Sequence, residues 1–70
     1  MDKKTTATMV EHMDDYNQWQ WYEVTFMPPK EAVQDYIDTH SENWRDEKII
    51  KSSEGYEAED LVRAFEITII

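Results

Sequence analysis

Hydrophobic side chains recur at every second position in residues 18–27, which is the period of a β-strand. One side of this alternation carries Tyr22, Val24 and Phe26, and we expect these three side chains to face the core. Two consecutive prolines follow; proline ends a strand but is well placed in the first turn of a helix. The pattern therefore predicts a strand over residues 18–27 that leads directly into a helix.

The period changes to that of an α-helix from Lys30 to about Glu42. Apolar side chains and one histidine recur there at steps of three and four residues and form a single stripe. The members of the stripe are Val33, Tyr36, Ile37 and His40, and Trp44 follows at the same spacing. The sequence therefore predicts one amphipathic helix that packs on the core through one side.

The rest of the C-terminal half predicts two strands separated by a turn. Residues 47–52 read as a short strand, and residues 53–60 read as an acidic turn around Gly55, the only glycine of the chain. Residues 61–70 alternate and become β-branched, which favours a strand. Residues 57–66 also fit one face of a helix, so that alternative stays open.

The N-terminal residues 5–17 allow a hairpin strand or a short helix. A threonine-rich alternation followed by Asp-Asp-Tyr-Asn indicates a strand and its turn, and we favour that interpretation. The resulting order is β-β-α-β-β, an α+β fold with a small antiparallel sheet of three to four strands and one helix on one face. At 70 residues we expect a single domain over residues 1–70.

The residue types argue against an enzyme and against a bound cofactor or metal. A core of this size leaves little room for a substrate pocket. One glycine cannot build a phosphate-binding loop, and no serine has the glycine-flanked context of a nucleophile elbow. The chain has no cysteine, and His12 lacks the spacing of a specific metal site. We therefore expect a protein that binds a macromolecule without catalysing a reaction.

Charge indicates the kind of partner. Sixteen Asp and Glu against seven Lys and Arg give a net charge of −9. Binding to phosphates needs a basic face, so a protein with a basic surface is favoured as partner and direct contact with nucleic acid is disfavoured. The lack of cysteine fits a reducing compartment, and no apolar run approaches the ~18 residues of a membrane span. We therefore expect a cytoplasmic location without membrane contact.

Acidic residues gather in two groups. Along the predicted helix, at steps of four, three and four, lie Glu31, Asp35, Asp38 and Glu42. In the predicted turn lie Glu54, Glu57, Glu59 and Asp60. A solvated helix face is the ordinary explanation for such a row. Like charges at this spacing repel by a few tenths of a kcal/mol per pair, however, and no lysine follows Lys30 in the helix to relieve the repulsion.

The acidic groups suggest imitation of a nucleic acid. At a rise of ~1.5 Å per residue the helix presents a carboxylate about every 5 Å, on the scale of the ~3.4 Å charge spacing of a DNA strand. Our leading hypothesis is an inhibitor or modulator that occupies a basic, normally nucleic-acid-binding surface of its partner. Small acidic proteins of this kind are often encoded by phages and directed at host defence or transcription, which is the source we expect.

Two tryptophans support an alternative function. Trp19 and Trp21 lie on the other side of the predicted strand from the core-facing residues, and aromatic side chains are typical interface anchors. The apolar residues 67–70 would also invite pairing with another chain, for which homodimerisation is the simplest remedy. The alternative is an assembly subunit that uses these residues, with acidity serving solubility.

Overall fold

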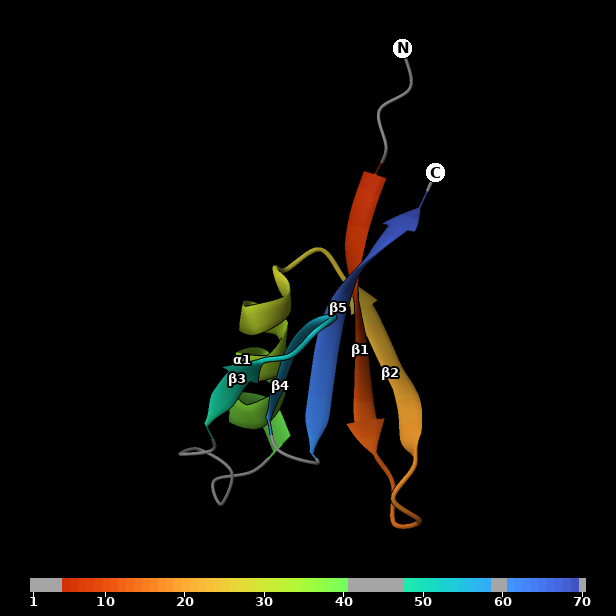
Figure 1. The fold of residues 1–70 in the computed structure, drawn as a ribbon, viewed down its shortest axis with the longest axis vertical. Helices are drawn as coiled ribbons and strands as arrows, with labels where there is room; N and C mark the ends of the chain where they lie inside the picture. Colours follow the sequence, from red (N-terminus) through yellow and green to blue (C-terminus); the bar gives the residue numbers. More distant parts are fainter. Residues whose placement is uncertain (1–4, 41–47, 59–60, 70) are drawn as a thin grey trace.

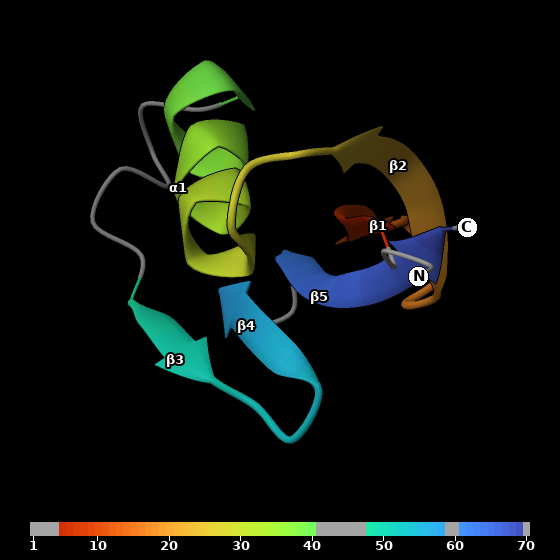
Figure 2. The same cartoon turned by 90° about the horizontal axis from the view of Figure 1, so that it is seen from above.

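A computed structural model of the chain describes residues 5–40, 48–58 and 61–69. In chain order its elements are β1 (Thr5–Met13), β2 (Trp19–Thr25), α1 (Pro29–His40), β3 (Ile49–Lys51), β4 (Gly55–Ala58) and β5 (Val62–Ile69). All the strands pair antiparallel in one sheet of order β2-β1-β5-β4-β3. The helix packs on one face of this sheet (Figure 1, Figure 2). The α+β class and the position of the helix between the second and third strands are confirmed.

The sheet has five strands instead of three to four, and the additional strand is β4. This strand lies within residues 53–60, which we expected as a turn. A Cβ at Gly55 would overlap the backbone oxygen of Ala64, so only glycine allows β4 to approach β5 this closely. A turn does precede Gly55, and the N–H of Gly55 donates to Oγ of Ser52 at 3.1 Å. A second turn joins β4 to β5, where the N–H of Leu61 donates to the carbonyl oxygen of Ala58 at 2.9 Å. Because β5 is a strand, the helical alternative for residues 57–66 is wrong.

The predicted hairpin of β1 and β2 is confirmed, and Asp14 builds its turn. Oδ1 of Asp14 accepts hydrogen bonds from the backbone N–H of Tyr16 at 2.8 Å and of Gln18 at 2.9 Å. Oδ2 accepts a third, of 2.9 Å, from Nε2 of Gln20. These donors, and the Gln18 N–H above all, lower the pKa of the Asp14 carboxyl. Asn17 has a φ of 60°, a left-handed conformation that asparagine tolerates.

A β-bulge interrupts β2 at Tyr22. Trp21 pairs with Glu11 of β1. The next pair along the strands is Glu23 with Val10, so Tyr22 between them has no partner in β1. An extra residue of this kind shifts the alternation of the strand by one position.

The bulge corrects the expectation that Tyr22, Val24 and Phe26 face the core together. Tyr22 does face the helix, with its ring 4.9 Å from that of Tyr36. Beyond the bulge, however, Val24 pairs with Met9 and is 44% exposed. Phe26 lies past the end of β2 and is 76% exposed. An uninterrupted alternation in the sequence thus hides a change of face in the structure.

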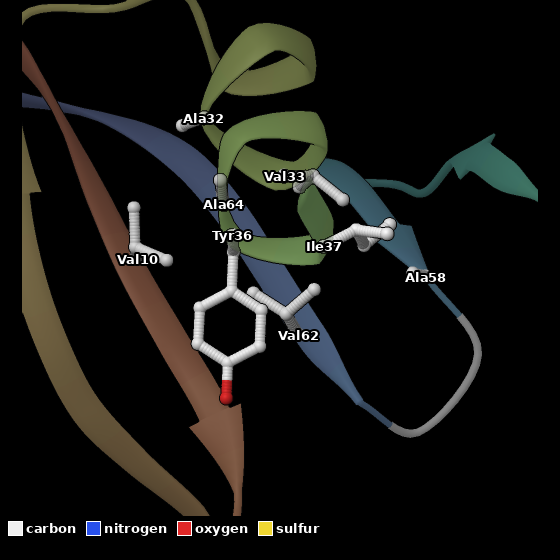
Figure 3. Close-up of a cluster of buried hydrophobic side chains, with 8 residues drawn as sticks. All are labelled: Val10, Ala32, Val33, Tyr36, Ile37, Ala58, Val62 and Ala64. Carbon is white, nitrogen blue, oxygen red and sulfur yellow. The ribbon is translucent and has the colours of Figure 1, made fainter. Parts of the chain in front are cut away.

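The core lies between α1 and the side of the sheet that faces it (Figure 3). Its side chains are small or β-branched apart from one tyrosine, and they are Val10, Ala32, Val33, Tyr36, Ile37, Ala58, Val62 and Ala64. The helix contributes four of them; the helical period predicted Val33, Tyr36 and Ile37 but not Ala32, and His40, which it also predicted for the stripe, is exposed. Because these side chains are small, the two layers approach closely and the volume they enclose is small.

Candidate docking surfaces

The outer side of α1 carries a row of exposed carboxylates. We call Glu31, Asp35 and Asp38 the acidic row; all three are exposed, opposite the buried side of the helix. Glu42, which the sequence adds to this row, lies outside the described residues. The orientation follows from the helical period, because the apolar stripe packs on the sheet and turns the row to water.

Few of the described residues compensate the charge of the acidic row. Asp38 Oδ1 accepts a hydrogen bond of 2.9 Å from Nε2 of Gln34. Across residues 5–40, 48–58 and 61–69, no ion pair engages a member of the row. Within α1, all of which is described, Lys30 is the only lysine or arginine, and it lies at the N-terminal end. The row therefore presents its full negative charge to an approaching molecule.

The second acidic group does not extend the acidic row. Glu54 is exposed before β4, and Glu57 is half-buried within it. Ala58 faces the core, so the side chain of its neighbour Glu57 points to the opposite face of the sheet. Glu59 and Asp60 lie outside the described residues. Glu57 and the acidic row consequently lie on opposite sides of the molecule.

The face of the sheet away from α1 is the second surface, and we call it the open face. Pairing and alternation place on it Thr5, Ala7, Met9, Glu11, Met13, Trp19, Trp21, Val24, Ile50, Glu57, Arg63, Phe65, Ile67 and Ile69. Of these, Ala7 is buried. Trp21 is 63% exposed and Ile50 is 42% exposed. Among the described elements, α1 is the only one outside the sheet, and it covers the other face (Figure 2). Both tryptophans predicted as anchors therefore lie on this surface.

Arg63 organises the middle of the open face. Its Nη2 lies 2.7 Å from Oε1 of Glu11, and its Nε donates to the same oxygen. The guanidinium carbon is 4.5 Å from the ring centroid of Trp19, a cation–π contact, and 5.9 Å from that of Phe65. The guanidinium of Arg63 thus contacts the indole of Trp19 and forms an ion pair with Glu11. Sequence reasoning missed the Arg63–Glu11 pair, because the two residues meet only through the pairing of β1 with β5.

Hollows on the described surface are small. One of about 200 Å³ opens beside Arg63 and is lined by polar residues of the β3–β4 turn, including Ser52, Ser53 and Glu54. Ligand sites typically enclose about 300–1,000 Å³. Within the described ranges, no three His, Asp or Glu side chains are placed to share a metal ion. The large surfaces, and not the hollows, are the candidate sites.

The two histidines form an aromatic cluster between β1, β2 and α1. Nδ1 of His12 lies 3.2 Å from the hydroxyl of Tyr36. His40 stacks on Tyr36 with ring centroids 4.1 Å apart, although its side chain stays exposed. The ring of Tyr22 lies 5.5 Å from that of His12 and 5.1 Å from that of His40. Burial, together with the nearby Tyr22, raises the pKa of Tyr36, and the cluster joins the helix to the bulged strand.

Comparison with protein-family models, with curated proteins and with solved structures finds no match to the chain. In the described part of the chain, no helix is long and apolar enough to cross a bilayer: α1 has 12 residues, against about 20 for a spanning helix. The acidic row and the open face are therefore the two candidate docking surfaces of the described chain.

Proposed function

We propose that the chain is a small acidic, non-catalytic binding protein that inhibits or modulates a partner protein by occupying a basic surface of that partner. The observation that carries this proposal is the acidic row, which is exposed and uncompensated on a protein of net charge −9. The partner surface is one that normally holds nucleic acid, and the cytoplasm of a phage-infected bacterium is the setting we infer. The chain itself makes no direct contact with nucleic acid.

The electrostatic repulsion between the carboxylates of the acidic row supports a role in binding. Glu31 and Asp35 are four residues apart, and Asp35 and Asp38 are three apart, so each pair repels by about 0.2–0.5 kcal/mol. An alternating pattern with lysine would give the same solubility and stabilise the helix. The row instead gains free energy when a cationic surface approaches, because the mutual repulsion is then replaced by attraction.

Mimicry also fits the curvature of the surface. A helix that protrudes from a sheet is a convex ridge, and basic grooves that hold nucleic acid are concave (Figure 1). Association would be accelerated by the long-range field of the whole protein, and the row would then occupy the groove. High salt should weaken such a complex, since the Debye length falls from ~10 Å at 0.1 M to ~3 Å at 1 M.

Two variants of equal net charge test the proposal. The row variant carries Glu31→Gln, Asp35→Asn and Asp38→Asn. The control carries Asp15→Asn, Glu54→Gln and Glu66→Gln, three exposed carboxylates outside α1. Wild type, row variant and control are immobilised, and proteins retained from a bacterial lysate are identified by mass spectrometry. We expect wild type and control to retain the same protein, duplex DNA to release it, and the row variant to lose it; retention by the row variant at the wild-type level would reject the proposal.

The open face favours a second candidate function. With 63% of its surface exposed, Trp21 is a large apolar side chain that the folded chain leaves in water. The alternative is therefore an assembly subunit that buries Trp19, Trp21 and the C-terminal strand in a complex, its acidity serving solubility. A complex of this kind would hold at 1 M salt and tolerate the row variant, so the same experiment separates the two functions.

A further inference from the structure

The open face is nearly neutral on a protein that is otherwise strongly acidic. Its charged side chains are Glu11, Arg63 and Glu57, and the first two neutralise each other at 2.7 Å. Among the described residues, Glu57 alone leaves an uncompensated charge on this face, and the other described carboxylates lie elsewhere. The rest of the surface consists of aromatic, aliphatic and methionine side chains. The described residues thus carry most of their charge away from the face of the sheet that α1 does not cover.

This segregation identifies the occupant of the open face. A basic partner would be expected to meet free carboxylates, but the Glu11 carboxylate is already engaged by Arg63. A second copy of this chain needs instead a face on which two like-charged molecules present few carboxylates to each other, and on the open face only Glu57 is a carboxylate without an ion pair among the described residues. The Arg63–Glu11 pair is also partly shielded, with exposures of 33% and 21%, so it would enter such a contact already satisfied.

The size of the open face is sufficient for a dimer. Its strands have nine, seven, three, four and eight residues. At ~3.3 Å per residue and ~4.8 Å between strands, they cover about 500 Å². Two such faces bury about 1,000 Å², which is the lower limit of specific interfaces. Trp21, Val24 and Ile50 would each count twice in a two-fold contact.

We propose that two copies of the chain pack through their open faces, sheet against sheet, and that the contact covers Trp21 and Val24 of the edge strand β2. The two packed sheets would lie about 10 Å apart. Because α1 lies on the far face of each sheet, both helices would face outward and the dimer would display two acidic rows on opposite sides. The dimer itself does not depend on the proposed function. That each dimer would offer two acidic rows to partners does rest on the proposed function. A partner that binds nucleic acid along a groove would then be bridged to a second partner molecule.

Sedimentation equilibrium of the full chain from about 1 µM to about 1 mM tests the dimer. We expect a mass of twice 8.4 kDa for wild type. Trp21→Glu and, independently, Val24→Glu place a charge in the contact and should raise the dissociation constant of the dimer at least about thirtyfold. Both residues are exposed in the single chain, so far-UV circular dichroism should show both variants folded. Tyr16→Ser, which alters an 83% exposed aromatic residue in the β1–β2 turn, is the control and should leave the mass unchanged.

Salt separates this proposal from the proposed function, because its effect has the opposite sign in the two complexes. Raising the salt concentration screens the repulsion between two acidic copies and should tighten the dimer. The same change should weaken binding of the acidic row to a basic partner. A monomeric mass for wild type throughout the concentration range would overturn the dimer, as would a dimer that both open-face variants leave intact. A dimer whose row variant still binds its partner would instead reject the proposed function alone.

Discussion

The side chains on the two faces of the sheet differ in size and in how much of their surface is exposed. Under α1 the sheet contributes Val10, Ala58, Val62 and Ala64, all 1% exposed or less. On the open face it contributes tryptophan, phenylalanine, methionine and isoleucine, several of them more than a third exposed. Some of the largest apolar side chains of the sheet, Trp21 above all, are therefore left largely in water by the single chain. The face under α1 therefore carries the core, and the open face leaves large apolar side chains partly in water.

Chain length explains this division. A domain of 70 residues buries only about 60% of the surface of its unfolded chain, and one helix of 12 residues covers one face of the sheet. Small side chains on the covered face let helix and sheet approach closely. Large side chains on the other face would gain their burial energy only from a second molecule.

Truncation of one residue on each face tests whether the two faces contribute differently to the stability of the single chain, and it should have the largest effect. Ile37→Ala removes a fully buried side chain and should lower the free energy of unfolding by about 2–5 kcal/mol, enough to leave the chain largely unfolded. Trp21→Ala should cost the dilute single chain less than about 1 kcal/mol. Urea denaturation at a concentration below the dimer dissociation constant measures both. Equal losses would mean that the open face contributes to the fold of the single chain.

Neutralising the middle of the acidic row should have a smaller effect, of opposite sign. Asp35→Asn relieves repulsion with both Glu31 and Asp38 and should raise the free energy of unfolding by about 0.3–1 kcal/mol. The gain should shrink at 1 M salt, since the repulsion is then screened. Binding to the partner should weaken at the same time. Glu66→Gln is the matched control, and an equal gain there would show that the row carries no special repulsion.

The smallest expected effect is the pH dependence due to Asp14. The hydrogen bonds in the turn lower the pKa of this carboxyl in the folded chain below its ordinary value in an unfolded chain. Their stabilising contribution is therefore fully present above about pH 4 and is lost as the pH falls through the folded pKa. Asp14→Asn should reduce the free energy of unfolding at pH 7, and its difference from wild type should vanish towards pH 2. A difference that stays constant down to that pH would contradict the role given to the charged carboxylate.

Periodicity predicted the elements that are long and one-sided. The helical stripe of Val33, Tyr36 and Ile37 gave both α1 and the outward direction of the acidic row, because burial of one helix side fixes the other. The hairpin turn followed from local chemistry at Asp14 and Asn17. Features of this kind depend on residues that are near neighbours in the chain.

Features that depend on strand pairing could not be predicted. The strand β4 is only four residues long, and its acidic composition suggested a turn; a close approach to Ala64 that only Gly55 permits makes it a strand. The bulge at Tyr22 leaves no mark in the alternation of β2. The Arg63–Glu11 pair spans 52 positions and forms through the register of β5 on β1. For the same reason the sequence grouped Glu57 with the other acidic residues, whereas the sheet directs it to the open face.

Contact between the acidic row and the partner is tested most directly by the salt dependence of binding. The dissociation constant of the captured protein is measured for wild type, row variant and control between about 0.1 and 1 M salt. We expect the binding of wild type and of the control to weaken equally and steeply as the salt concentration rises. The row variant should bind weakly at low salt and show a flatter dependence, because the charges that respond to salt have been removed. Three parallel curves of equal affinity would contradict the account and leave the open face as the docking surface.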